Sequence, residues 1–166
     1  MWLGKEISFW REKIEEISKE FTAIEIMKEE MPGLGQTTAA TLYAELGDPK
    51  RFKNEKAYAK ATGLTPGYRS SGGKQTGTTL SRAGSSRARW ALTQAALACL
   101  RCKGGAGGQV KQWILSRAQG RKRKKVVVAA GRKLAEGIWR LFNLEESFDL
   151  ARAFGGKAKV SSVSGG

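Results

Sequence analysis

The chain has 166 residues, enough for one compact domain with an attachment, and 40% of them are hydrophobic, which suffices for a modest core. Lysine and arginine number 30 against 15 aspartates and glutamates, and the resulting net charge of +15 is typical of proteins that bind a polyanion. The sequence contains no histidine, which excludes Ser/His/Asp and Cys/His catalytic sets and histidine-ligated metals.

The charge is distributed unevenly along the chain. Residues 1–48 carry a net charge of −5, so the rest carries +20. Between Arg51 and Lys133 the only acidic residue is Glu55, set against 20 lysines and arginines. That imbalance is too strong for an ordinary solvated surface, and it predicts that nucleic acid contacts this basic body.

The apolar runs and the two cysteines indicate where in the cell the protein is located. No apolar run approaches the roughly 18 residues of a membrane helix, and the first residues lack the apolar segment of a secretory signal. We therefore expect a cytoplasmic protein without membrane contact. Cys99 and Cys102 fit two reduced, half-buried thiols on one helix face, with redox or intersubunit metal chemistry as the alternative.

Residues 1–30 form the first predicted element, a helical arm. Its apolar residues are spaced alternately by four and three, as in the seam of a coiled coil. They are Leu3, Ile7, Trp10, Ile14, Ile17, Phe21 and Ile24. The arm packs either on its own body or on the arm of a second chain. The narrow stripe with charged flanks favours the second arrangement, a homo-oligomer of two or more chains.

The arm ends at Met31, and the next residues are Pro32-Gly33-Leu34-Gly35 before a helix that opens with Gln36 and Thr37. This pattern predicts a helix-hairpin-helix element with Gly33, Gly35 and Thr37 at a DNA phosphate. Glycines allow a close backbone approach, and the N–H groups at a helix start attract anions. The alternative is a tight turn between two core helices.

A short helix over 54–62 leads into a loop of about 63–79 that is rich in glycine, serine and threonine. Loops of this length are usually functional or disordered. Ser70 and Ser71 lie there among cations that could stabilise charge on a phosphoryl group, namely Arg69, Lys74, Arg82 and Arg87. The alternative is a flexible loop that only hydrogen-bonds phosphates.

The second half of the chain predicts three further helices. The first spans 85–101 and has an apolar face of Ala88, Leu92, Ala95, Ala96 and Cys99. Arg87 and Arg89 lie at its start, and we expect both to contact nucleic acid. The second spans 109–118, and the third spans 126–142 with Val127, Ala130, Leu134, Ile138 and Leu141 inward.

A basic run precedes the third of these helices and consists of Arg121, Lys122, Arg123, Lys124 and Lys125. Cations at a helix N-terminus oppose the helix dipole, so a bound polyanion explains their position better than stability does. We expect residues 31–145 to form the DNA-binding domain and residues 146–166 a helical remnant with a flexible tail.

Several motifs follow one another in an order that resembles a known family. They are Met31-Pro-Gly-Leu-Gly, Leu46-Gly-Asp48, Arg51-Phe52, Gly63-Leu64-Thr-Pro66, Ser70-Ser-Gly-Gly-Lys74, Arg82-Ala-Gly84, Arg87, Arg89-Trp90-Ala91-Leu92, and Ala129 with Arg132-Lys133-Leu134. The order resembles the C-terminal transposase domain of the insertion sequence 110/116/902 family, the DEDD transposases that act as bridge-RNA-guided recombinases. The resemblance covers about residues 22–142.

The resemblance implies a serine that links covalently to a DNA strand, which corresponds to Ser71, with Ser70 as second choice. It implies DNA and a structured guide RNA as partners. In that family a separate RuvC-like domain supplies four carboxylates that bind magnesium. This chain has no such cluster, so we expect it to bind no cofactor alone and to be inactive without that domain.

The sequence thus predicts an all-α DNA-binding C-terminal domain of a transposase that supplies the serine nucleophile. The alternative is a non-catalytic helix-hairpin-helix nucleic-acid-binding protein that dimerises through its N-terminal helix.

Overall fold

The computed structural model describes residues 2–67, 70–71, 74–75, 79–80 and 83–155, and the side chains of residues 66–82 are outside the description. The described helices are α1 (Trp2–Ser18), α2 (Thr22–Glu30), α3 (Gln36–Leu46), α4 (Glu55–Ala61), α5 (Ser86–Cys99), α6 (Gly105–Ala118), α7 (Arg123–Asn143) and α8 (Leu150–Phe154), with the 3-10 turn η1 (Pro49–Arg51). Four two-residue strands, β1 (Pro66–Gly67), β2 (Ser70–Ser71), β3 (Lys74–Gln75) and β4 (Thr79–Leu80), lie between α4 and α5. The predicted all-α fold is confirmed.

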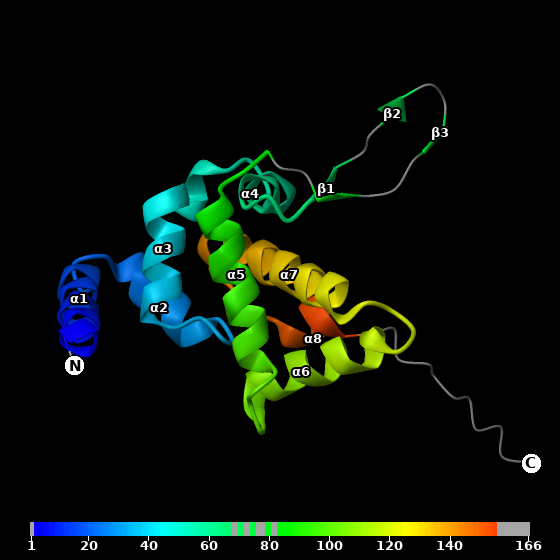
Figure 1. Cartoon of the computed structure of the whole chain (residues 1–166). Helices are drawn as coiled ribbons and strands as arrows, with labels where there is room; N and C mark the ends of the chain where they lie inside the picture. The colour runs from blue at the N-terminus through cyan, green and yellow to red at the C-terminus, as the bar shows by residue number, and fades with distance from the viewer. Residues whose placement is uncertain (1, 68–69, 72–73, 76–78, 81–82, 156–166) are drawn as a thin grey trace, which may run out of the picture.

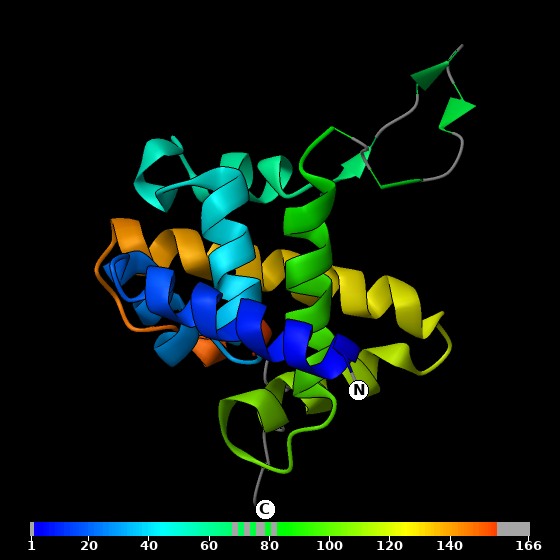
Figure 2. The same ribbon diagram turned by 60° about the vertical axis from the view of Figure 1, so that its left-hand side comes forward.

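Helix α5 lies at the centre of the helical body in both views of the ribbon (Figure 1, Figure 2) and packs on α3, α6 and α7. Its inward face is built from small residues, and the predicted set is fully buried: Ala88, Leu92, Ala95, Ala96 and Cys99. Small side chains let the neighbouring helices approach α5 closely on two sides. The apolar period of the sequence was sufficient to predict this face.

Helix α7 supplies the other half of the core. Val127, Ala130, Leu134 and Ile138 are buried as predicted. Leu141 is only partly buried, and Phe142 takes the inward position at this end of the helix. Each residue rotates the helix by about 100°. At the end of the core, Phe142 therefore takes the buried position that the apolar pattern assigned to Leu141.

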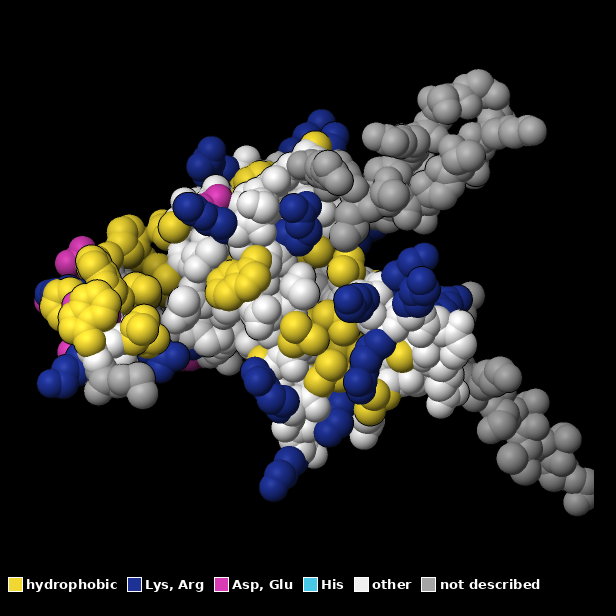
Figure 3. Space-filling model, in the orientation of Figure 1, with side chains coloured by type: hydrophobic (Ala, Val, Ile, Leu, Met, Phe, Trp, Pro, Cys, Tyr) yellow, Lys and Arg dark blue, Asp and Glu magenta, His cyan; other side chains and the backbone are white. Residues whose placement is uncertain are grey.

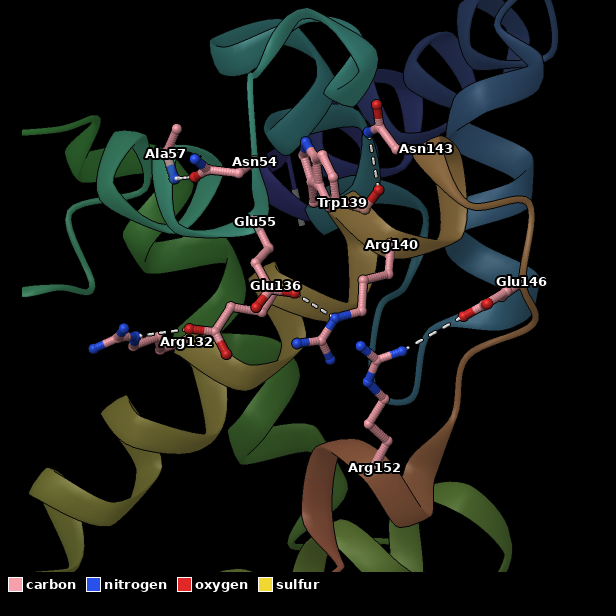
Figure 4. A network of polar contacts seen from close by, with 10 residues as sticks. All are labelled: Asn54, Glu55, Ala57, Arg132, Glu136, Trp139, Arg140, Asn143, Glu146 and Arg152. Atoms are coloured by element: carbon pink, nitrogen blue, oxygen red, sulfur yellow. Dashed lines mark hydrogen bonds and ion pairs between the residues drawn. The ribbon is translucent and has the colours of Figure 1, made fainter.

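A network of polar contacts joins α7 to the segment around η1 and the start of α4 (Figure 4). The indole Nε1 of Trp139 donates a hydrogen bond to the carbonyl of Phe52 at 2.8 Å. Arg140 forms an ion pair with Glu55. The single carboxylate of the basic body is therefore engaged in holding two helices together.

The arm differs from the single helix that the heptad spacing predicts. Helix α1 ends at Ser18, and a turn precedes α2. The last part of the seam packs on the helical body: Ile24 is buried, and the ring of Phe21 lies 5.2 Å from that of Tyr43 on α3. The part of the seam on α1 is largely exposed, including Ile7 and Ile17. The domain limits 1–30, 31–145 and 146–166 stay predictions.

The described C-terminal residues pack on α6 and α7. Phe154 of α8 is buried, and its ring lies 5.3 Å from that of Trp113 on α6. Of the segment 146–166, which the sequence predicts as a helical remnant and flexible tail, residues 156–166 are outside the described residues.

No helix among the described residues is long and apolar enough to cross a membrane.

The two cysteines are free thiols, Cys99 buried and Cys102 half-buried. Burial raises the pKa of Cys99 to about 12, so its thiol stays protonated and unreactive at neutral pH. The predicted pair of half-buried thiols on one helix face is wrong in its geometry, because Cys99 is fully buried at the end of α5 and Cys102 lies beyond that helix.

Candidate nucleic-acid interface

The turn between α2 and α3 uses its first glycine for packing. Gly33 has φ +77°, and a Cβ atom there would lie 2.2 Å from the carbonyl oxygen of Ala95 and 2.7 Å from Sγ of Cys99. Both atoms belong to α5. Gly33 therefore allows the turn to approach α5 closely, which is the tight-turn role that the sequence left open.

The second glycine of the turn faces outward. Gly35 is the exposed N-cap of α3, and no atom lies within 4 Å of the position a Cβ would take. Its N–H donates to Oγ1 of Thr38 at 2.9 Å, and Thr37 is exposed beside it. The carboxylate of Glu25 accepts a hydrogen bond from Gln36 at 3.2 Å. The start of α3 is thus open to solvent, with one carboxylate at its edge.

The loop after α4 leaves and re-enters the body through a tight neck. A Cβ on Gly84, which has φ +142°, would lie 2.7 Å from Cα of Gly63, and the N–H of Ser85 donates to the carbonyl of Ala61 at 2.8 Å. Arg89 is half-buried, and its Nη1 donates to the carbonyl of Gly63 at 3.5 Å. This predicted nucleic-acid ligand therefore contacts the neck of the loop.

The two serines lie on the short strand β2, which pairs antiparallel with β3 in the register Ser70↔Gln75 and Ser71↔Lys74. Figure 1 shows this pair of strands well away from the helical body. The side chains of Ser70, Ser71 and Lys74 are outside the description, and the predicted ligands Arg69 and Arg82 lie outside the described residues.

A carboxylate from α3 joins the base of the loop to the start of α5. The hydroxyl of Ser85 donates to Oε2 of Glu45 at 2.7 Å, and Nη1 of Arg87 lies 3.3 Å from Oε1. The hydrogen bond from Ser85, with a smaller contribution from Arg87, lowers the pKa of Glu45. The side chain of Arg87 is still 79% exposed, so its guanidinium can reach a phosphate.

Sequence reasoning missed Glu45 as part of this site. Glu45 and Arg87 are 42 positions apart, and no motif or periodicity connects them. Only the packing of α3 on α5 places them together.

The basic run lies on the connection from α6 to α7 and on the first turn of α7. All five residues, Arg121 to Lys125, are exposed. The N-cap of α7, Lys122, has no side-chain capping hydrogen bond. Figure 3 shows Lys and Arg side chains gathered near this connection. The local charge is therefore repulsive, and an anion bound there would relieve that repulsion.

Acidic side chains gather on a different part of the molecule. An open hollow of about 360 Å³ is lined by Glu29, Glu30, Glu145 and Glu146 together with Lys50. This hollow does not suit a polyanion. Across the described residues, no group of three or more Asp, Glu or Cys side chains is arranged to hold a metal ion.

The family model "Transposase IS116/IS110/IS902 family" matches residues 28–112. These residues include the turn at Gly33, the serine loop and α5, and they make up half of the chain. The chain belongs to this family of transposases, as its order of motifs predicted.

Individual relatives agree with the family. The chain is 32% identical over 133 residues to y4pF/y4sB of Sinorhizobium fredii, which is named as a transposase; the match covers 80% of this chain and 34% of the relative. It is 30% identical over 136 residues to the transposase for insertion sequence element IS1328 of Yersinia enterocolitica, and this match covers 77% of this chain and 40% of the relative. It is also 30% identical over 118 residues to the transposase for insertion sequence element IS1111A of Coxiella burnetii, and this match covers 71% of this chain and 32% of the relative. The chain spans about a third of the length of these relatives.

Proposed function

We propose that this chain is the DNA-binding C-terminal part of a transposase and that it carries the serine nucleophile for strand exchange. The observation that carries this proposal is the position of the serine strand. β2 lies well away from the helical body on a loop whose neck is fixed to that body, and the exposed guanidinium of Arg87 lies at the base of this loop. Family membership and the exposed basic run support the same function.

The proposed chemistry is a transfer of a DNA phosphoryl group to Ser71. The hydroxyl of Ser71 gives up its proton as its oxygen attacks phosphorus, the bond from phosphorus to a deoxyribose oxygen breaks, and the departing oxygen takes up a proton. Guanidinium groups at the loop stabilise the negative charge on the phosphoryl oxygens without titrating. Ser70 is the second choice of nucleophile. The chain has no histidine as a base, so a RuvC-like partner domain would supply the carboxylates and the magnesium.

Binding to DNA or structured RNA is expected to weaken steeply with salt, because each neutralised phosphate releases counterions. Contact with five or more phosphates gives a slope of about −4 or steeper in a plot of log affinity against log salt. Fluorescence anisotropy with a labelled duplex measures this slope. A slope of about −1 to −2 would contradict an extended basic interface.

Replacing Arg121 to Lys125 with glutamine tests the basic run within the same assay. We expect a similar loss of affinity for every DNA sequence and a slope that is shallower by about 1 for each lost phosphate contact. Since all five side chains are exposed and their charges repel one another at the start of α7, the variant should unfold at the temperature of the unmodified protein or slightly above it. Unchanged affinity would exclude the run from the interface.

We also propose that α1 pairs with α1 of a second copy. Figure 3 shows hydrophobic side chains gathered over this helix. The exposed members on the seam are Leu3, Ile7, Trp10 and Ile17, and a helix with such a surface is stabilised by a partner helix.

Changing Ile7 and Ile17 to Asp places two charges in that seam. Both side chains are at least half exposed in the single chain, so its fold should persist while association loses several kcal/mol. Sedimentation velocity is expected to show a monomer with unchanged helical content. Ser8→Asp, off the seam on the same helix, is the matched control and should leave the mass of the assembly unchanged. If the unmodified protein, the double variant and Ser8→Asp all sediment with the same mass, α1 is not the interface.

A further inference from the structure

Trp90 is an aromatic residue that the core does not use. It lies on the outer face of α5 with 49% of its surface exposed. Arg87 lies three positions before it and Leu97 seven positions after it, so the three side chains share one stripe of the helix. Arg101, which is also exposed, follows at the end of this stripe just beyond α5. The stripe combines an indole with guanidinium groups at both ends.

Helix α3 runs alongside this stripe in the opposite direction. The turn before α3 contacts Ala95 in the second half of α5, whereas Glu45 near the end of α3 contacts Ser85 before the start of α5. The exposed residues of α3 include the small Thr37 and Ala44, and also Glu45, which contacts Arg87 at the start of the stripe. The indole itself keeps about half of its surface exposed beside α3.

The charge of this face selects the kind of partner. The two helices α3 and α5 carry one carboxylate between them, Glu45. The other strongly exposed tryptophans, Trp2 and Trp10, are on the glutamate-rich arm instead. The face around Trp90 thus complements an anionic partner, whereas the arm does not.

We infer that the Trp90 face binds single-stranded nucleic acid by stacking an unpaired base on the indole while Arg87 holds a neighbouring phosphate. Side chains three positions apart on a helix have Cβ atoms about 5–6 Å apart, so one nucleotide can contact both. In a duplex the faces of the bases are covered by their neighbours, and an exposed indole can stack only on a base that is out of the stack. This inference rests on the proposed nucleic-acid binding and specifies which form of nucleic acid this face binds.

The test compares a labelled 20-nucleotide oligothymidine with a labelled 20-base-pair duplex on the full chain. Trp90→Ala is expected to weaken binding to the oligothymidine by roughly 5- to 100-fold, the range for one base–aromatic stack, and binding to the duplex by less than two-fold. Trp90→Phe keeps an aromatic face and should retain most of the affinity, whereas Trp90→Leu, which keeps apolar area without a π-face, should behave like Trp90→Ala.

Trp2→Ala is the matched control, because it removes an exposed tryptophan of the acidic arm that is not part of the proposed seam and should leave both affinities unchanged. Equal oligothymidine affinities for the unmodified protein and Trp90→Ala, with duplex binding intact, would overturn this inference and leave the proposed function standing. A change in sedimenting mass on Trp90→Ala without nucleic acid would overturn it in favour of a protein partner. If the unmodified protein binds neither probe, the proposed function itself fails.

Discussion

Ser71→Ala is expected to abolish any covalent protein–DNA adduct while leaving DNA affinity within a few-fold of the unmodified protein. The reason is that a phosphoserine link requires the hydroxyl oxygen, whereas binding depends on the surrounding cations. The measurement is a denaturing gel of a labelled suicide duplex, with magnesium and a RuvC-like domain from a full-length relative added in trans.

Ser70→Ala is the internal control for this experiment, since it changes the neighbouring residue on the same strand β2. If Ser70 carries the chemistry, the adduct survives in Ser71→Ala and disappears in Ser70→Ala. If no adduct forms with either the unmodified chain or the variants, the catalytic proposal is wrong, and a non-catalytic nucleic-acid-binding protein that dimerises through its N-terminal helix remains.

Gly33→Ala is expected to lower the free energy of unfolding by about 3 kcal/mol. The new methyl group would collide with the carbonyl of Ala95 at 2.2 Å, and φ +77° is strained for any residue with a Cβ. For a chain of this size such a loss corresponds to a fall in Tm of about 10 °C. Thermal unfolding followed by circular dichroism measures it.

Gly35→Ala is the matched change two residues further along the turn. Nothing lies within 4 Å of the new methyl group and the backbone is extended there, so Tm should change by no more than about 2 °C. If α3 receives a phosphate at its start, the methyl group should instead weaken DNA binding, because it keeps the phosphate away from the backbone. An equal loss of stability in both variants would show that the two glycines share one structural role.

The sequence alone determined the features that depend on local periodicity. The inward faces of α5 and α7 follow from apolar residues at helical spacing, and their burial confirms the prediction. The order of short motifs likewise identified the transposase family, because an ordered set of motifs is far more specific than any single one. The long run of positive charge between Arg51 and Lys133 was visible without any structure.

The heptad spacing of the arm was a less complete guide. It continues unbroken through Phe21 to Ile24, yet the helix ends at Ser18. The spacing of apolar residues states which side chains need to be covered, but it does not state which surface covers them. Tyr43 and the body cover the last part of the seam, while the part on α1 stays exposed.

The tertiary structure decided what the residues of the candidate interface do. Packing of the turn on α5 gives Gly33 a structural role and leaves Gly35 facing solvent. Packing of α3 on α5 brings Glu45 to Arg87, and packing of α7 on α4 uses Glu55 in an ion pair with Arg140. These contacts join residues far apart in the chain, and because local periodicity contains no information about such distant pairs, only the assembled helices determine them.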